Sequence, residues 1–241
     1  DILWNDIGYP DADDFHRLAV SPEVRQRAAA FREEMGGRTL MLGVDRLDYT
    51  KGIPYRLGAF DLALQRYPEL RGELTLLQLV VPSRTRVPEY EKMKHEIDEL
   101  VGRINGAHTR GAWTPVHYIY RSLPTEELIS LYRACDIALI TPLRDGMNLI
   151  AKEYCASSVT RQEGVLILSE FAGAARQMGR HALLVNPYHV DHVAATIHQA
   201  FSMPAGERRR RMRALRGSVS RNDVYLWARQ FLEAAARVRD G

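Results

Sequence analysis

Two cations stand close together in the sequence, beside a turn and a helix start. Arg46 and Lys51 flank the turn, and Gly52 opens the helix. An Arg side chain can grip phosphate oxygens in two places, Lys adds a compact charge, and a helix N-terminus adds free N–H groups. Together these groups suit a diphosphate. The alternative is that both cations are solvated and pair with Asp45 and Asp48.

Two carboxylates follow a later apolar run, in the segment from Thr141 to Glu153. A glycine permits a tight turn there, and Asn148 is placed to cap the helix that carries Glu153. We expect Asp145 in the loop facing a ligand and Glu153 about one and a half turns into the helix. One carboxylate can then hold sugar hydroxyls while the other takes the two hydroxyls of a ribose. The spacing equally allows Asp145 to cap a helix and Glu153 to pair with Lys152 or a neighbouring helix.

Other charged side chains give weaker indications. Arg84 follows the second apolar run and is placed to face an anion, with a plain exposed arginine as the alternative. No third metal ligand accompanies His189 and His192, so we expect no metal site and no cofactor. A basic helix spans Arg208 to Arg216, for which a solvated face is the first interpretation and polyanion contact the alternative.

The order of apolar and amphipathic segments indicates the fold. Six apolar runs have the length of strands, at residues 39–44, 74–81, 116–120, 136–141, 164–168 and 182–185. Segments with helical character lie at residues 22–35, 54–67, 88–105, 125–134, 148–157, 171–178, 190–202, 205–216 and 222–238. Strands that are apolar throughout indicate a sheet buried on both faces. The alternation of strands and helices then predicts an α/β fold with a parallel, doubly wound sheet.

In such a sheet, ligands lie outside the carboxyl ends of the strands. The loops after Val44, Val81, Tyr120 and Thr141 are therefore expected near a ligand. Both charged motifs fall in these loops, which places them at one edge of the sheet.

Composition excludes several classes of protein. A net charge of +3 is too weak by itself to indicate a nucleic-acid partner. No apolar run is long enough to span a bilayer and no secretory signal opens the chain, so we expect a cytoplasmic protein without a membrane partner. Cys135 and Cys155 lie in apolar segments and are expected to be buried, reduced thiols.

The first twenty residues are acidic, aromatic and aperiodic. We interpret residues 1–20 as a linker or entry segment and residues 21–241 as a single Rossmann-like domain. A chain of 241 residues is within reach of one α/β domain.

Taken together, these segments closely resemble the trehalose-6-phosphate synthase family. The resemblance runs from Phe15 to Leu232 and is carried by Val44 to Gly52, Gly102 to Gly106, Ile140 to Glu153, Val165 to Ala174 and Val185 to Pro187. The family has two Rossmann-like domains facing a cleft, the GT-B arrangement. Its members transfer glucose from UDP-glucose, or sometimes GDP-glucose, to glucose 6-phosphate with retention at the anomeric carbon. The resemblance implies that this chain is the C-terminal, donor-binding half of such a glycosyltransferase.

Matched onto this chain, the family pattern implies a role for each candidate residue. Arg46 and Lys51 would hold the donor diphosphate, Asp145 the glucose hydroxyls and Glu153 the ribose. Arg84 would reach the phosphate of the acceptor. Leu123 would lie beside the base, where some members have an aromatic residue, so the base preference stays open. Further donor contacts, chiefly through the backbone, are implied for Asn148, Leu149, Ile150, Ala151 and Lys152.

The implied mechanism is substitution on one face of the sugar, in which the leaving phosphate helps to take the acceptor proton. Fixed cations and helix N–H groups would stabilise the charge that grows on that phosphate. Such a site needs no dedicated nucleophile and no metal.

Family members also carry an N-terminal domain that supplies most acceptor contacts, and nothing in this sequence corresponds to it. We therefore expect the chain alone to bind nucleotide weakly and to transfer little or no sugar. A homo-oligomer is an expectation for the full-length protein only. Glucosylglycerol phosphate synthesis, cyclitol coupling and a non-catalytic nucleotide-binding role remain open as alternatives.

Overall fold

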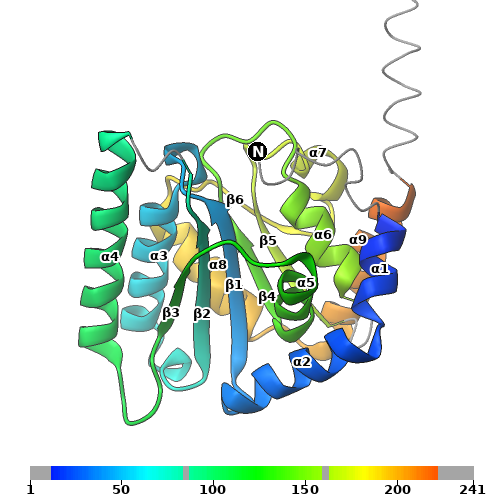
Figure 1. The fold of residues 1–241 in the computed structure, drawn as a ribbon, viewed down its shortest axis with the longest axis horizontal. Coiled ribbons are helices and arrows are strands. Elements are labelled where there is room, and N and C mark those ends of the chain that lie inside the picture. Colours follow the sequence, from blue (N-terminus) through cyan, green and yellow to red (C-terminus); the bar gives the residue numbers. More distant parts are fainter. Residues whose placement is uncertain (1–11, 84–86, 159–162, 222–241) are drawn as a thin grey trace, which may run out of the picture.

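A computed structural model describes residues 12–83, 87–158 and 163–221. Its centre is a parallel sheet of six strands in the order β3-β2-β1-β4-β5-β6 (Figure 1). The strands are β1 (Thr39–Arg46), β2 (Leu74–Val81), β3 (Val116–Tyr120), β4 (Ile137–Ile140), β5 (Val165–Ser169) and β6 (Leu183–Val185). The expected α/β class and doubly wound parallel sheet are confirmed.

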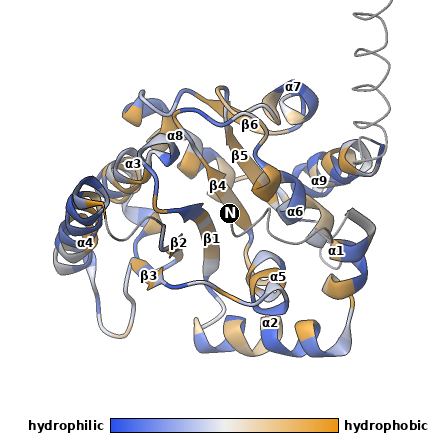
Figure 2. Ribbon diagram, turned by 45° about the horizontal axis from the view of Figure 1, so that its top comes forward, coloured by the Kyte–Doolittle hydropathy of each residue, from blue (hydrophilic) through white to orange (hydrophobic). Residues whose placement is uncertain are grey.

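Helices cover both faces of the sheet (Figures 1 and 2). One face carries α3 (Ile53–Arg66), α4 (Pro88–His108) and α8 (Val190–Phe201). The other face carries α1 (Ala12–Ala19), α2 (Pro22–Glu34), α5 (Thr125–Ala134), α6 (Leu149–Ser157) and α9 (Ala205–Arg221). The short helix α7 (Ala175–Met178) follows β5, and two 3-10 turns, η1 (Tyr49–Lys51) and η2 (Pro68–Leu70), follow β1 and α3.

Alternate residues of the central strands enter two separate cores. In β1, Met41 packs with α3 and α8, whereas Leu40 and Leu42 pack with the helices of the opposite face. A strand buried on both sides must be apolar at every position, since successive side chains point to opposite faces. All eight residues of β2 are buried, which explains the continuous apolar run at residues 74–81.

The chain order reverses between β1 and β4. From β1 the sheet grows outward through β2 to β3, and from β4 it grows the other way through β5 to β6. The loops after β1 and β4 therefore leave the carboxyl edge of the sheet toward opposite faces. Ligands of doubly wound sheets bind at this switch point.

Several local expectations differ from the structure. Residues 12–19 form helix α1 rather than an aperiodic linker, and its Phe15 and Ala19 are buried in the core shared with α6. Helix α7 begins at Ala175 instead of residue 171, and α9 continues to Arg221 instead of ending at residue 216. Strand β1 runs on to Arg46. The helix expected at 222–238 and residues 1–11 lie outside the described residues.

Both cysteines are buried and free, as expected, and burial raises the pKa of each thiol. No helix in the described part of the chain is long and apolar enough to cross a membrane.

Candidate functional site

The loop after β1 is a tight turn that presses against the loop after β4. The Asp48 carboxylate accepts hydrogen bonds from the Thr50 N–H (2.8 Å) and the Thr50 hydroxyl (2.6 Å). Gly52 then adopts the left-handed conformation, at φ 64°. A Cβ atom there would lie 2.9 Å from the Leu143 side chain, so only glycine fits this turn.

Backbone hydrogen bonds join the same two loops. The N–H groups of Leu143 and Arg144 both donate to the carbonyl oxygen of Thr50, at 2.7 and 3.2 Å. The loop that carries Lys51 and the loop that carries Asp145 are thus fixed to each other before any ligand arrives.

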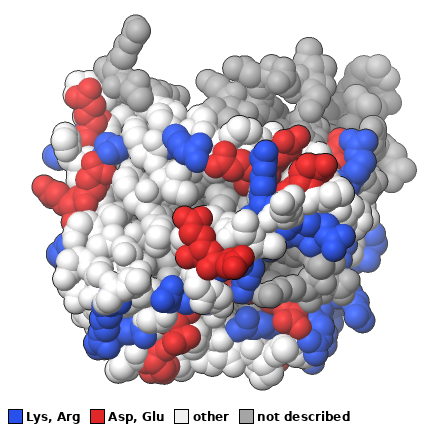
Figure 3. Space-filling view, turned by 60° about the horizontal axis from the view of Figure 1, so that its bottom comes forward, with Lys and Arg blue, Asp and Glu red and all other residues white. Residues whose placement is uncertain are grey.

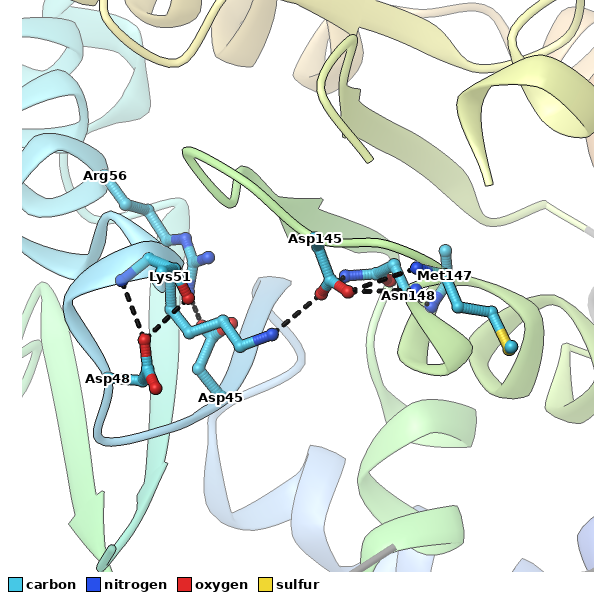
Figure 4. A network of polar contacts seen from close by, with 9 residues as sticks. Asp45, Asp48, Lys51, Arg56, Asp145, Met147 and Asn148 are labelled. Atoms are coloured by element: carbon cyan, nitrogen blue, oxygen red, sulfur yellow. Dashed lines mark hydrogen bonds and ion pairs between the residues drawn. The ribbon is translucent and has the colours of Figure 1, made fainter. Parts of the chain in front are cut away.

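Lys51 and Asp145 meet across this junction (Figure 4). The Lys51 ammonium lies 2.8 Å from one Asp145 oxygen, and each side chain is about 15% exposed. Asp145 also accepts from the Asn148 N–H (3.2 Å) and the Asn148 side-chain amide (3.0 Å). Burial alone would raise the pKa of Asp145, but Lys51 and Asn148 outweigh it and hold that pKa below its usual value.

Helix α6 begins directly behind this ion pair. Asn148 stands at φ 62°, and its side-chain oxygen accepts from the Ala151 N–H at 3.0 Å, as expected of a cap. The first N–H groups of a helix have no acceptor within it. The amides of Leu149 and Ile150 are therefore the donors that α6 can offer an anion, while Lys152 is part-buried in the same turn.

A third loop, after β5, supports the second. The Asp145 N–H donates to the Phe171 carbonyl (3.4 Å), and the Gly173 N–H donates to the Asp145 carbonyl (2.9 Å). A Cβ atom on Gly173 would lie only 2.0 Å from the Gly146 carbonyl oxygen. This contact explains why residues 171–174 are not helical, contrary to expectation: they run alongside the Asp145 loop.

The alternative pairing of the two cations with Asp45 and Asp48 does not occur. Asp45 is buried against Arg56, and Asp48 caps the turn. Arg46 ends β1, is partly exposed, and forms no ion pair within residues that the structure describes. Arg46 therefore lies at the same carboxyl edge of the sheet as Lys51, and its positive charge is available to a ligand.

Two further candidates are less central. Leu123 lies between β3 and α5, partly buried against the core that α5 and α6 share. Arg84 lies outside the described residues. Neither is shown to belong with Lys51 and Asp145.

Glu153 is 3% exposed, deep in α6. One of its oxygens accepts a 2.7 Å hydrogen bond from the hydroxyl of Tyr132 in α5, so it does pair with a neighbouring helix. Burial raises the pKa of Glu153 to about 8. Tyr132 was not indicated by the sequence, in which it reads as an ordinary core aromatic.

The Glu153→Gln variant should be relatively more stable at high pH. A carboxyl whose pKa is raised in the folded state contributes stability that is complete below its ordinary pKa of 4.5 and lost as pH rises through about 8. A glutamine has no such dependence. Between pH 4 and pH 9, we expect the free energy of unfolding of the variant to rise relative to that of the wild type by on the order of 4 kcal/mol.

Urea unfolding at the two pH values measures this difference. Glu126→Gln, at an exposed position of the neighbouring helix, controls for the loss of a charge. If the free energies of unfolding of Glu153→Gln and of the wild type changed equally between the two pH values, the assignment of a buried, protonated carboxyl would be contradicted.

The opposite edge of the sheet has a different character. A cavity of about 410 Å³ lies there, lined by Arg25, Arg32 and Arg133 but also by Glu33, Asp136 and Glu163. Figure 3 brings the lower side of Figure 1 forward and shows positive and negative side chains intermingled. The cavity includes none of the predicted site residues. No group of three or more metal-ligating side chains occurs in the described ranges.

The basic helix α9 uses much of its charge internally. Arg208 donates to the carbonyls of Phe201 (2.6 Å) and Met203 (2.9 Å) at the end of α8, and Arg211 pairs with Glu207 at 2.7 Å. Arg209 pairs with Glu163. At least three arginines of α9 are therefore engaged in contacts within the chain.

A doubly wound sheet with cations, a carboxylate and a helix N-terminus at its switch point has the features of a nucleotide-binding domain. The sequence profile of glycosyltransferase family 20 matches residues 6–237, and the chain belongs to that family. The resemblance drawn from the motifs is thereby confirmed.

Individual relatives agree. A trehalose-6-phosphate synthase of Mycobacterium leprae is 47% identical over 94% of this chain. The E. coli trehalose-6-phosphate protein, solved bound with UDP-2-fluoro glucose, is 36% identical over 92% of this chain with a TM-score of 0.87. A UDP-forming alpha,alpha-trehalose-phosphate synthase of Burkholderia xenovorans, solved with glucose-6-phosphate, is 35% identical over 92% of this chain, also with a TM-score of 0.87. The chain spans 45% of the Mycobacterium relative and 49% of each solved chain.

Proposed function

We propose that this chain forms the donor-binding half of a retaining glycosyltransferase that moves glucose from UDP-glucose to glucose 6-phosphate, producing trehalose 6-phosphate. The observation that carries the proposal is the contact of Lys51 with Asp145 beside the start of α6, at the switch point between β1 and β4. The solved relatives support the choice of substrates: the E. coli protein was solved with UDP-2-fluoro glucose bound, and the Burkholderia protein with glucose-6-phosphate.

In this proposal the diphosphate lies between Arg46, Lys51 and the first amides of α6. Asp145 takes hydroxyls of the glucose, next to the phosphate. Arg46 ends β1 and Lys51 lies in the η1 turn that follows, so both cations meet the diphosphate from one side while the helix dipole meets it from the other. Glu153 as the ribose contact, Leu123 as the base contact and Arg84 as the acceptor-phosphate contact stay predictions.

The chemistry then follows from charge. The bond between the anomeric carbon and the diphosphate oxygen breaks, and the acceptor hydroxyl oxygen bonds to that carbon from the same face. The hydroxyl proton passes to the leaving phosphate, on which negative charge grows. Fixed cations and helix N–H groups stabilise that charge more in the transition state than in the ground state.

Calorimetry with the two cations removed tests the proposal. We expect Arg46→Ala and Lys51→Ala each to weaken binding of UDP and UDP-glucose by about 10-fold or more, because each removes a charge-assisted contact to phosphate. The double variant should show no measurable binding. Arg103→Ala, at a 65% exposed position on α4, controls for the loss of positive charge.

Unchanged affinity in the double variant would remove the phosphate site from its assigned place. The same titrations with GDP and GDP-glucose decide the base. The proposal predicts weaker binding for the guanine nucleotides than for UDP and UDP-glucose.

A further inference from the structure

A fully buried arginine lies beneath the candidate site. Arg56, on α3, has no exposed side-chain surface, and it forms an ion pair with the equally buried Asp45. Its Nε donates to the Thr141 hydroxyl at 3.1 Å, and its Nη1 donates to the Gln78 side chain at 3.2 Å. Its Nη2 is buried without a hydrogen-bond partner among the described residues.

The sheet is shaped around this guanidinium. Gly43 lies in the middle of β1, and a Cβ atom there would come within 2.8 Å of Arg56 Nη1 and 2.7 Å of Gln78 Oε1. Glycine inside a strand marks such a close approach. The position of Arg56 is therefore built into the core of the sheet.

Stability alone does not explain a buried pair of this kind. Apolar residues of similar volume are often neutral or stabilising in place of a buried ion pair. Here one guanidinium nitrogen also remains without a partner, which adds a cost of burial. A role in function therefore explains the buried pair better than a contribution to stability does.

The partners of Arg56 point to that reason. Asp45 directly precedes Arg46 at the end of β1, and Thr141 directly follows β4 and begins the loop that carries Asp145. One rigid side chain thus holds the carboxyl ends of the two strands that flank the switch point. Figure 4 shows Arg56 and Asp45 packed beside Lys51 and its partner Asp145.

We propose that Arg56 is a positioning residue of the donor site, which holds the ends of β1 and β4 at the separation that lets Arg46, Lys51 and Asp145 contact one ligand. This inference rests on the proposed function, because UDP-glucose is the ligand used to measure it. A planar guanidinium reaches Asp45 and Thr141 together, and the single ammonium of a lysine does not.

Two variants test this role, so the test still works if one of them fails to fold. Thr141→Val keeps the shape of the side chain and removes only the acceptor for Nε. Arg56→Lys keeps the charge and removes the bridge. We expect each to weaken UDP-glucose binding by about 10-fold, because small displacements of positioning groups have effects of this size or more.

The chain offers a matched control. Thr75 is another buried threonine, and its hydroxyl accepts a 3.0 Å hydrogen bond from the Trp113 indole at the start of β2, far from the switch point. Thr75→Val removes the same kind of contact and should lower stability in urea as Thr141→Val does. Its affinity for UDP-glucose should stay within about 2-fold of the wild type, as expected of distant, independent sites.

A double-mutant cycle separates positioning from general loosening. If Thr141 and Arg56 act through the phosphate-binding loops, Thr141→Val should cost little further affinity once Lys51→Ala is present. Wild-type affinity in both Thr141→Val and Arg56→Lys, an equal loss in Thr75→Val, or full additivity with Lys51→Ala would each overturn the inference while leaving the proposed function standing. Failure of the wild-type chain to bind UDP-glucose would overturn both.

Discussion

Replacing Asp145 by asparagine is expected to weaken UDP-glucose binding by about 100-fold while leaving the fold intact. The carboxylate contacts Lys51 and both polar groups of Asn148, so its charge organises the β4–α6 loop as well as facing the sugar. An asparagine amide has one acceptor oxygen, and its NH₂ group would oppose either Lys51 or the Asn148 donors. Calorimetry measures the loss.

Asp98→Asn is the control for this substitution. Asp98 also forms an ion pair with a lysine, at 2.6 Å, but on the more exposed surface of α4. Its replacement should leave nucleotide affinity unchanged and alter stability by less than about 1 kcal/mol. Affinity within 2-fold of the wild type in Asp145→Asn would mean that this carboxylate neither holds the sugar nor orders the loop.

Gly173→Ala should displace the Asp145 loop and remove most of the binding. The new methyl group would stand 2.0 Å from the Gly146 carbonyl oxygen, and backbone on both sides leaves no flexible side chain to yield. Overpacking of this kind costs about 1–3 kcal/mol of stability, and the shift acts directly on the loop that Gly173 supports. We expect at least a 10-fold loss of UDP-glucose affinity, a size that misplaced site groups commonly produce.

Gly146→Ala supplies the matched comparison, because a Cβ atom on that side of the same contact would meet nothing within 4 Å. Its affinity should remain close to that of the wild type. If Gly173→Ala binds as well as Gly146→Ala, the β5–α7 loop does not position the Asp145 loop.

The sequence was sufficient to predict the fold because a strand that is buried on both faces is apolar along its length. Each strand reads as an apolar run, and all six were found within two residues of their observed ends. Parallel strands place their following loops at one edge, so Lys51 and Asp145, far apart in the chain, could be expected at the same place.

The remaining features depend on contacts between distant segments. A charged residue such as Arg56 predicts an exposed position. Its burial is made tolerable by the gap left at Gly43 and by acceptors in β1, in β2 and directly after β4. The capping role of Asn148 follows from local sequence and was predicted. The Tyr132–Glu153 hydrogen bond joins two helices, so no local pattern reports it.

Helix α1 shows the same limit. It has only eight residues, and a short isolated helix is marginal in water. Phe15 and Ala19 stabilise it by entering the core beside α6, a contact between segments more than a hundred residues apart.

A crystal structure of the chain with UDP-glucose bound would show where the diphosphate lies. We predict that it lies at the carboxyl ends of β1 and β4, with its oxygens within hydrogen-bonding distance of Lys51, Arg46 and the first amides of α6, and with the glucose beside Asp145. A diphosphate bound at the opposite edge of the sheet, or out of reach of Lys51 and α6, would contradict it.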